Sequence, residues 1–164
     1  MNCILVLGGA RSGKSRHAES LVTAEPGPWR YVATGRAWDD EMRLRIDAHR
    51  SQRGTGWNTV EAPVDLVSPL QCPEPVLIDC TTLWLTNLIL NEDDVASATD
   101  RLLEALFRRS ALTVLVGNEV GSGIVPENAL ARRFRDEAGL LHQKLARHAR
   151  RVLFVVAGYA LDMK

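Results

Sequence analysis

The sequence predicts a single α/β domain in which a mostly parallel sheet is flanked by helices. Two observations lead to this fold class. Short apolar runs rich in β-branched residues alternate with longer helical stretches, and no linker, repeat or low-complexity segment interrupts them. Such alternation is typical of parallel strands joined by crossover helices. A length of 164 residues suits one hydrophobic core, so we expect residues 1–164 to form one domain.

A phosphate-binding pattern follows the first apolar run. The segment Gly8-Gly9-Ala10-Arg11-Ser12-Gly13-Lys14-Ser15 fits GxxxxGKS, the P-loop. Residues 3–7 before it predict a buried strand, and residues 16–22 after it predict a helix. Its glycines allow backbone N–H groups to surround a phosphate, and the helix N-terminus adds positive potential. We expect Lys14 to contact the β- and γ-phosphates of a nucleoside triphosphate and Ser15 to bind Mg²⁺. A glycine-rich turn without a ligand would not explain the complete strand, loop and helix.

Composition narrows the class of partner. Lys plus Arg and Asp plus Glu each number 20, so no overall basic field indicates nucleic-acid binding. No apolar run approaches the roughly 18 residues that span a bilayer, and the first residues predict a core strand rather than a signal peptide. Cys3, Cys72 and Cys80 lack metal-ligand spacing, and buried reduced thiols are expected. We therefore expect a cytoplasmic protein that binds neither nucleic acid nor membrane.

The second predicted strand, residues 29–34, ends in small residues. Because the carboxyl ends of parallel strands line the ligand crevice, we consider Ala33, Thr34 and Gly35 as candidates for the nucleotide pocket. Their small side chains would let the backbone approach a ligand. An ordinary strand-to-loop exit explains the same residues equally well.

Two later strands end in carboxylates. Residues 57–61 predict a strand that ends at Glu61, which can accept hydrogen bonds from N1 and N2 of guanine or can be a solvated loop charge. Residues 76–79 predict an apolar strand that ends at Asp79. In P-loop proteins a carboxylate in this position is associated with Mg²⁺, and we assign that role to Asp79.

A helix is predicted over residues 39–52, beginning with acidic residues that its dipole favours. His49 shares a face with Met42 and Ile46, so it points toward the body of the protein. Spacing alone favours a packed core histidine over a catalytic one. The end of this helix carries donors that can bind phosphate or ribose oxygens, or can simply stabilise the helix C-terminus: Arg50, Ser51, Gln52 and Arg53.

The second half of the chain continues the alternation. A loop over residues 117–128 contains three glycines and a proline, and its place after a strand predicts a mobile cover for substrate. A long helix with Arg132, Arg133 and Arg135 follows it. The remaining expected elements are helices at 80–90 and 100–110, strands at 112–116 and 151–157, and a short tail.

Five segments together resemble one known family. They are GGARSGKSRHAE at 8–19, YVAT at 31–34, DDEMRLRIDAHR at 39–50, LIDCTTLWLTNL at 77–88, and NEVGSGIVPENALARRFRDEAGLLHQ at 118–143. In this order they resemble the adenosylcobinamide kinase/adenosylcobinamide-phosphate guanylyltransferase family of cobalamin biosynthesis. The resemblance covers nearly the whole chain, and the segments at 39–50 and 118–143 distinguish this family from other P-loop proteins.

The resemblance implies a RecA-like P-loop fold and two reactions. ATP or GTP phosphorylates adenosylcobinamide; GTP then guanylylates a histidine, and the GMP passes to adenosylcobinamide phosphate to give adenosylcobinamide-GDP. The guanylylated histidine falls on His49, which reverses the conclusion from spacing. The family's nucleotide contacts fall on the residues already singled out, namely Gly8 to Ser15, Ala33 to Gly35, Arg50 to Arg53, Glu61 and Asp79. The resemblance also implies a homo-oligomer, commonly a trimer.

The sequence departs from the family pattern at a few positions. His142 stands where asparagine is usual, and Gly117 replaces a small polar residue. Three other functions remain open at this stage: a small-molecule kinase that forms no histidine adduct, a nucleotide-gated binding protein, and an enzyme that retains guanylyl transfer alone.

Overall fold

A computed structural model describes residues 1–36 and 54–164. Within these residues one sheet of seven strands has the order β3-β2-β4-β5-β1-β6-β7. The strands are β1 (Cys3–Gly8), β2 (Trp29–Ala33), β3 (Trp57–Glu61), β4 (Val76–Asp79), β5 (Thr113–Asn118), β6 (Arg151–Val156) and β7 (Tyr159–Asp162). The helices are α1 (Lys14–Thr23), α3 (Thr81–Leu90), α4 (Val95–Arg108) and α5 (Ala129–His148), with a 3₁₀ turn η1 (Ser68–Leu70).

The sheet is parallel except at one edge. Strands β1 to β6 pair in parallel, and β7 alone runs antiparallel to β6. Strand β5 lies between β1, which leads into the P-loop, and β4, which ends at Asp79. The predicted α/β fold class is therefore confirmed.

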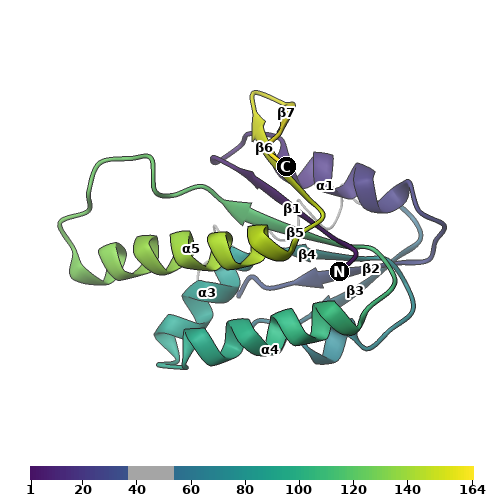
Figure 1. The fold of residues 1–164 in the computed structure, drawn as a ribbon, viewed down its shortest axis with the longest axis horizontal. Coiled ribbons are helices and arrows are strands. Elements are labelled where there is room, and N and C mark those ends of the chain that lie inside the picture. Colours follow the sequence, from purple (N-terminus) through teal and green to yellow (C-terminus); the bar gives the residue numbers. More distant parts are fainter. Residues whose placement is uncertain (37–53) are drawn as a thin grey trace.

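Helices cover both faces of the sheet, with α1 on one side and α3, α4 and α5 on the other (Figure 1). Each face has its own apolar core, because alternate strand residues point to opposite sides. Leu5, Ile78 and Leu115 face the three-helix side, where Trp84 of α3 is 1% exposed. On the other face Val6 and Val114 pack with α1. Packing on both faces thus fixes the positions of the strand ends, where a ligand site can form.

Several predicted boundaries differ from the structure by a few residues, and three of these differences follow from caps or strand length. The helix predicted at 100–110 begins at Val95, because Oδ1 of Asp94 accepts hydrogen bonds from the backbone N–H groups of Ala96 and Ser97 and caps it. The helix predicted from Cys80 begins at Thr81, with Cys80 as its N-cap residue. The strand predicted at 112–116 continues to Asn118, so the first two residues of the predicted loop belong to β5.

The short tail predicted after residue 157 is a strand. Ala157 and Gly158 have φ angles of 51° and 85°, the left-handed values that a two-residue hairpin turn requires. They return the chain as β7 along β6. No apolar periodicity marked this edge strand in the sequence.

The predicted helix over 39–52, with His49, Arg50, Ser51, Gln52 and Arg53, lies outside the described residues. None of the helices in residues 1–36 and 54–164 has the length and apolar character of a membrane span.

The cysteines match the expectation of reduced thiols. Cys3 and Cys80 are buried, and all three cysteines are free thiols. Burial raises the pKa of Cys3 to about 12, which keeps its thiol protonated.

Candidate nucleotide site

The P-loop joins the carboxyl end of β1 to the first turn of α1. Gly13, the N-cap residue of α1, has a φ of 94°, which favours glycine. Arg11 also has a positive φ, of 55°. These two residues turn the backbone sharply, so that the chain enters the helix directly after the strand.

Gly8 is required by close packing rather than by backbone angle. A Cβ at this position would lie 2.5 Å from the carbonyl oxygen of Val155 and 2.6 Å from Oγ of Ser12. The first of these atoms belongs to the backbone of the neighbouring strand β6 and has little room to move. At Gly9, by contrast, an added Cβ would meet nothing within 4 Å.

The β6–β7 turn supports the loop from outside. The backbone N–H of Gly158 donates a 2.8 Å hydrogen bond to the carbonyl oxygen of Ser12. A Cβ on Gly13 would lie 3.2 Å from Cα of Gly158, so the two glycines are in close contact. The β6–β7 hairpin therefore supports the conformation of the P-loop. The sequence alone predicts only a short tail here.

Lys14 places a positive charge within this loop. Its residue is only 8% exposed, although lysines are rarely buried in proteins. Its Nζ donates to the carbonyl oxygen of Gly9 at 3.1 Å, across the loop. The first turn of α1 contains no acidic residue that would neutralise the helix N-terminus. The ammonium and the helix end therefore combine in a site suited to phosphate.

A pocket of about 860 Å³ opens over the loop. This volume is in the range of pockets that bind ligands of nucleotide size. The pocket includes five residues outside the predicted P-loop, none of which is a predicted site residue. Its lining residues are Ala10, Arg11, Ser12, Gly13, Lys14, Ser15, Arg16, Glu19, Asn118, Glu119 and Val120.

A second group of predicted residues meets further along the same edge of the sheet. In the register of the strands, Ala33 of β2 pairs with Glu61 of β3 on one side and with Asp79 of β4 on the other. The hydroxyl of Tyr31 donates a 2.8 Å hydrogen bond to Oδ2 of Asp79. Tyr31 is 3% exposed, so this bond fixes the carboxylate from the buried side.

Thr34 has a supporting place in this group. It is fully buried, and its hydroxyl both donates to the carbonyl oxygen of Cys80 and accepts from the N–H of Cys80, each at 2.8 Å. Its backbone carbonyl accepts from the side chain of Asn87 at 2.8 Å. Thr34 therefore ties the exit of β2 to that of β4, while Ala33 and Gly35 on either side of it are partly exposed.

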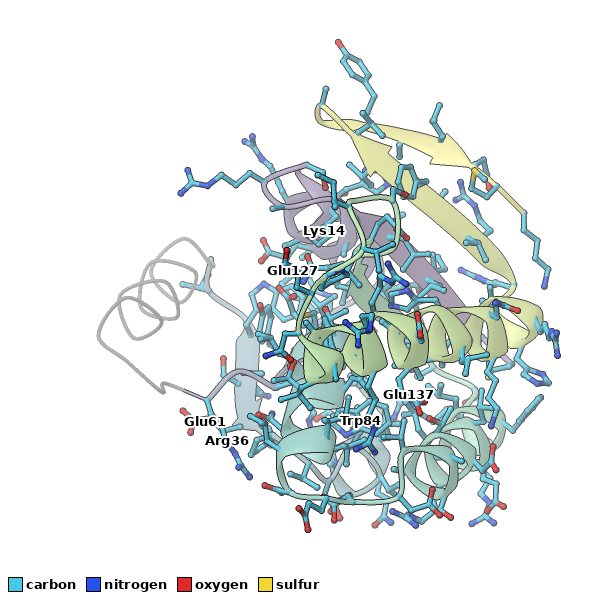
Figure 2. All side chains as sticks on the ribbon, turned by 90° about the vertical axis from the view of Figure 1, so that its left-hand side faces the viewer. Lys14, Arg36, Glu61, Trp84, Glu127 and Glu137 are labelled. Carbon is cyan, nitrogen blue, oxygen red and sulfur yellow. The ribbon has the colours of Figure 1, made fainter. Side chains whose placement is uncertain are left out.

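The two groups lie apart along the carboxyl edge of the sheet. Three strand spacings separate β1 from β2, roughly 14 Å. Figure 2 looks onto this edge and shows Lys14 near its middle and the exposed Glu61 at one side. Accordingly, the pocket over the P-loop does not include Ala33, Thr34, Gly35, Glu61 or Asp79 among its lining residues.

The donor set fits a hard cation such as Mg²⁺. Ser15 contributes a hydroxyl beside the P-loop and Asp79 a carboxylate, and oxygen atoms are the ligands that Mg²⁺ prefers. Within residues 1–36 and 54–164, no three His, Cys, Asp or Glu side chains form a metal-binding group. Mg²⁺ is commonly held by one or two protein oxygens together with substrate phosphates, so two such residues suffice.

The end of β5 was missed as part of the site. Asn118 lies between the P-loop strand and β4, and its Nδ2 donates to Oγ1 of Thr82 at 2.9 Å. Glu119 follows it into the pocket. The loop over residues 117–128 is predicted to cover substrate, but Asn118 and Glu119 are not predicted site residues, because a glycine-rich composition does not show which side chain turns inward.

Strand, loop, buried lysine and helix N-terminus converge on one pocket at the carboxyl edge of a mostly parallel sheet. These features define a P-loop nucleotide-binding protein. The family model for cobinamide kinase/cobinamide phosphate guanyltransferase matches residues 4–163. The chain belongs to this family, and the predicted family and its pair of enzymatic activities are confirmed.

Named relatives are similar over almost their entire lengths. The bifunctional adenosylcobalamin biosynthesis protein CobP of Pseudomonas aeruginosa is 45% identical over 166 residues, which cover 98% of this chain and 96% of that protein. The corresponding CobU proteins of Escherichia coli and Salmonella typhimurium are each 42% identical over 180 residues, covering 98% of this chain and 99% of theirs. Among solved structures, the flagellar accessory protein FlaH of Methanocaldococcus jannaschii is 11% identical, with a TM-score of 0.49. The match covers 99% of this chain and 78% of that protein, and no conclusion is based on it.

Proposed function

We propose that this chain phosphorylates adenosylcobinamide with ATP or GTP and then transfers GMP from GTP, through a guanylylated His49, to give adenosylcobinamide-GDP. The observation that carries the proposal is an intact P-loop with a buried Lys14, in a chain that the family model matches over residues 4–163. Both reactions break a phosphoanhydride bond, and both therefore need a cationic site for the departing phosphates.

The kinase reaction uses the P-loop to bind the phosphates. Backbone N–H groups of the loop and the Nζ of Lys14 neutralise charge on the β- and γ-phosphates as the alcohol oxygen attacks the γ-phosphorus. Mg²⁺, held by Ser15 and Asp79, supplies further neutralisation when it is bound. The Tyr31 hydroxyl keeps the Asp79 carboxylate oriented for that contact, at 2.8 Å.

The guanylyl transfer proceeds in two steps at the imidazole of His49. A ring nitrogen attacks the α-phosphorus of GTP, and the bond to the pyrophosphate oxygen breaks. A phosphate oxygen of adenosylcobinamide phosphate then attacks the same phosphorus and releases the imidazole. A histidine of ordinary pKa, about 6.5, is mostly neutral at pH 7 and can act as such a nucleophile.

The remaining predicted contacts are assigned to the nucleotide as well. We assign Arg50, Ser51, Gln52 and Arg53 to phosphate and ribose oxygens, and the Ala33–Gly35 segment to a close approach of its backbone. Thr34 would then hold that segment in shape through its bonds to Cys80. The exposed carboxylate of Glu61 is suited to the N1 and N2 edge of guanine, which would favour GTP as the GMP donor.

Assembly and location are part of the proposal. Exposed apolar side chains on β7 and beside α5 favour a homo-oligomer, because large exposed hydrophobic residues often mark interfaces. Tyr159 is 79% exposed and Ile124 is 97% exposed. We propose the trimer that the family resemblance implies, and a cytoplasmic location, where the nucleotide substrates are made.

Product analysis tests the function directly. The chain is incubated with adenosylcobinamide and Mg²⁺, with ATP alone or with GTP, and the corrinoids are separated by chromatography. We expect adenosylcobinamide phosphate with ATP alone and adenosylcobinamide-GDP with GTP. Lys14→Ala should abolish both products in a folded chain. If only adenosylcobinamide phosphate forms under both conditions, the chain is a kinase without guanylyltransferase activity. If the corrinoid stays unchanged although the chain binds GTP, the proposal is contradicted altogether.

A further inference from the structure

Glu119 occupies a special place at the carboxyl edge of the sheet. It is the first residue after β5, the strand between the P-loop strand β1 and the Asp79 strand β4. In the register of these strands Asn118 pairs with Gly8, and Val116 pairs with Asp79. The backbone N–H of Glu119 donates a 3.0 Å hydrogen bond to the carbonyl oxygen of Gly8. Glu119 therefore leaves the sheet beside the P-loop, on the side that faces Asp79.

The Glu119 carboxylate is held by the turn that follows it. Its Oε1 accepts hydrogen bonds from the N–H of Gly121 at 2.6 Å, from the N–H of Ser122 at 2.9 Å and from Oγ of Ser122 at 3.1 Å. Three donors on one oxygen fix the direction of the carboxylate before any substrate binds. Its side chain lines the pocket of about 860 Å³ together with Lys14 and Ser15.

This position is where the terminal phosphate would react. Lys14 and Ser15 mark the side of the P-loop that would face the β- and γ-phosphates. An acceptor alcohol must approach that phosphate from the open pocket, in line with the departing oxygen. Glu119 follows the strand between the P-loop strand and the Asp79 strand, and it lines that pocket.

We propose that Glu119 is the catalytic base of the kinase reaction, an assignment that rests on the proposed function. Its Oε2 accepts the proton of the adenosylcobinamide hydroxyl as the alcohol oxygen bonds to the γ-phosphorus. The bond from that phosphorus to the bridging oxygen breaks, and the nucleoside diphosphate leaves with the electron pair. The carboxylic acid then returns its proton to water.

The other carboxylates nearby are less suited to this role. Glu19 also lines the pocket, but it lies on α1, one helical turn beyond Ser15, and so flanks the P-loop instead of lying between it and Asp79. Asp79 is engaged by Tyr31 and lies outside the pocket lining. Glu119 alone among these three lines the pocket from the β5 exit.

The test compares Glu119→Gln with two matched variants. Gln retains an oxygen that can accept from Gly121 and Ser122, so the turn should persist while the base is lost. Glu104→Gln changes an exposed carboxylate on α4, outside the pocket, and is the matched control; Ser122→Ala removes one of the three donors that hold the base. Each variant is assayed for phosphorylation of adenosylcobinamide by saturating ATP, for the KM of ATP, for thermal unfolding, and for self-labelling by GTP that carries label at the α-phosphate.

We expect Glu119→Gln to lower kcat for phosphorylation by about 100-fold or more, the usual scale for a lost general base. The KM for ATP, the unfolding temperature and the self-labelling should stay close to wild type, because the nucleophile in labelling is not an alcohol. Glu104→Gln should retain the phosphorylation rate, and Ser122→Ala should lower it less than Glu119→Gln does. A Glu119→Gln variant that keeps more than a tenth of the rate, or that loses self-labelling in parallel, would overturn the assignment. A wild-type chain inert in both assays would instead overturn the proposed function, and the assignment with it.

Discussion

His142 fills the space that a side chain on Gly117 would need. A Cβ added to Gly117 would lie 2.6 Å from Nε2 of His142, and also 2.8 Å from Cδ2 of Leu7 and 3.0 Å from Oγ1 of Thr81. His142 comes from α5 and is 7% exposed, and Gly117 lies in β5. Both positions depart from the pattern of the family that the sequence resembles. The structure shows that the two departures compensate each other sterically.

This packing predicts a coupling between the two positions. Gly117→Ser should destabilise the chain by about 1–3 kcal/mol, the usual cost of overpacking a core. In a His142→Asn background the same change should cost less, because the shorter side chain leaves room. Urea unfolding of the wild type, both single variants and the double variant gives the coupling free energy. Strictly additive effects would contradict the steric account.

The same histidine predicts a pH dependence of stability. Burial lowers the pKa of His142 below its ordinary value, and the charge of Glu119 opposes the shift only in part. In mild acid the unfolded chain therefore binds more protons at this residue than the folded chain does. Its contribution to stability is complete above about pH 6.5 and decreases as the pH falls toward the lowered pKa.

His142→Asn isolates this contribution. Between pH 7.5 and 5.5 the free energy of unfolding of the wild type should decrease more than that of the variant, since asparagine does not titrate. Urea midpoints measured at several pH values provide the comparison. Parallel pH profiles for the two proteins would show that His142 is not held neutral by the fold.

The two glycines that begin the P-loop should respond differently to substitution. Gly8→Ala places a methyl group 2.5 Å from the carbonyl oxygen of Val155, so the loop or β6 must shift. We expect a lower unfolding temperature and at least a tenfold loss of GTP affinity, which corresponds to about 1.4 kcal/mol. Gly9→Ala is the matched control, because nothing lies within 4 Å of the added atom, and its unfolding temperature should match the wild type. Equal destabilisation by both changes would be inconsistent with the packing described.

Tyr31→Phe removes the buried donor to Asp79. A hydrogen bond to a charged group contributes about 1.5–3 kcal/mol, so we expect a loss of stability near the lower end of that range. Titration of GTP with and without Mg²⁺ should also show a smaller effect of the cation, because the carboxylate is less firmly oriented. Tyr159→Phe, at a tyrosine that is 79% exposed, serves as the control and should change neither measurement. An unchanged cation effect in Tyr31→Phe would separate Tyr31 from the metal site.

The elements and the loop could be predicted from the sequence because their signals are local. Apolar runs gave β1 to β5 within two residues of their ends, and GxxxxGKS specified the strand, loop and helix that the structure contains. Register then brings Ala33, Glu61 and Asp79 together, as expected for strands that end at one edge.

What the sequence could not provide depends on contacts between distant residues. The bond from Gly158 to Ser12, the bond from Tyr31 to Asp79 and the fit of His142 over Gly117 each join segments that no periodicity relates. Glu119 enters the site only because β5 lies between β1 and β4, an order that a single sequence does not specify. The helix predicted to begin at residue 100 begins instead at Val95, directly after its capping residue Asp94.

The most direct test of the central claim is a search for a histidine–GMP adduct. The chain is incubated with Mg²⁺ and GTP labelled at the α-phosphate, denatured, and assayed for label that is stable in base and labile in acid. The account predicts such label on the wild type and on the His148→Ala control, and none on His49→Ala. Absence of label from a folded wild type that binds GTP, or label that persists in His49→Ala, would contradict it.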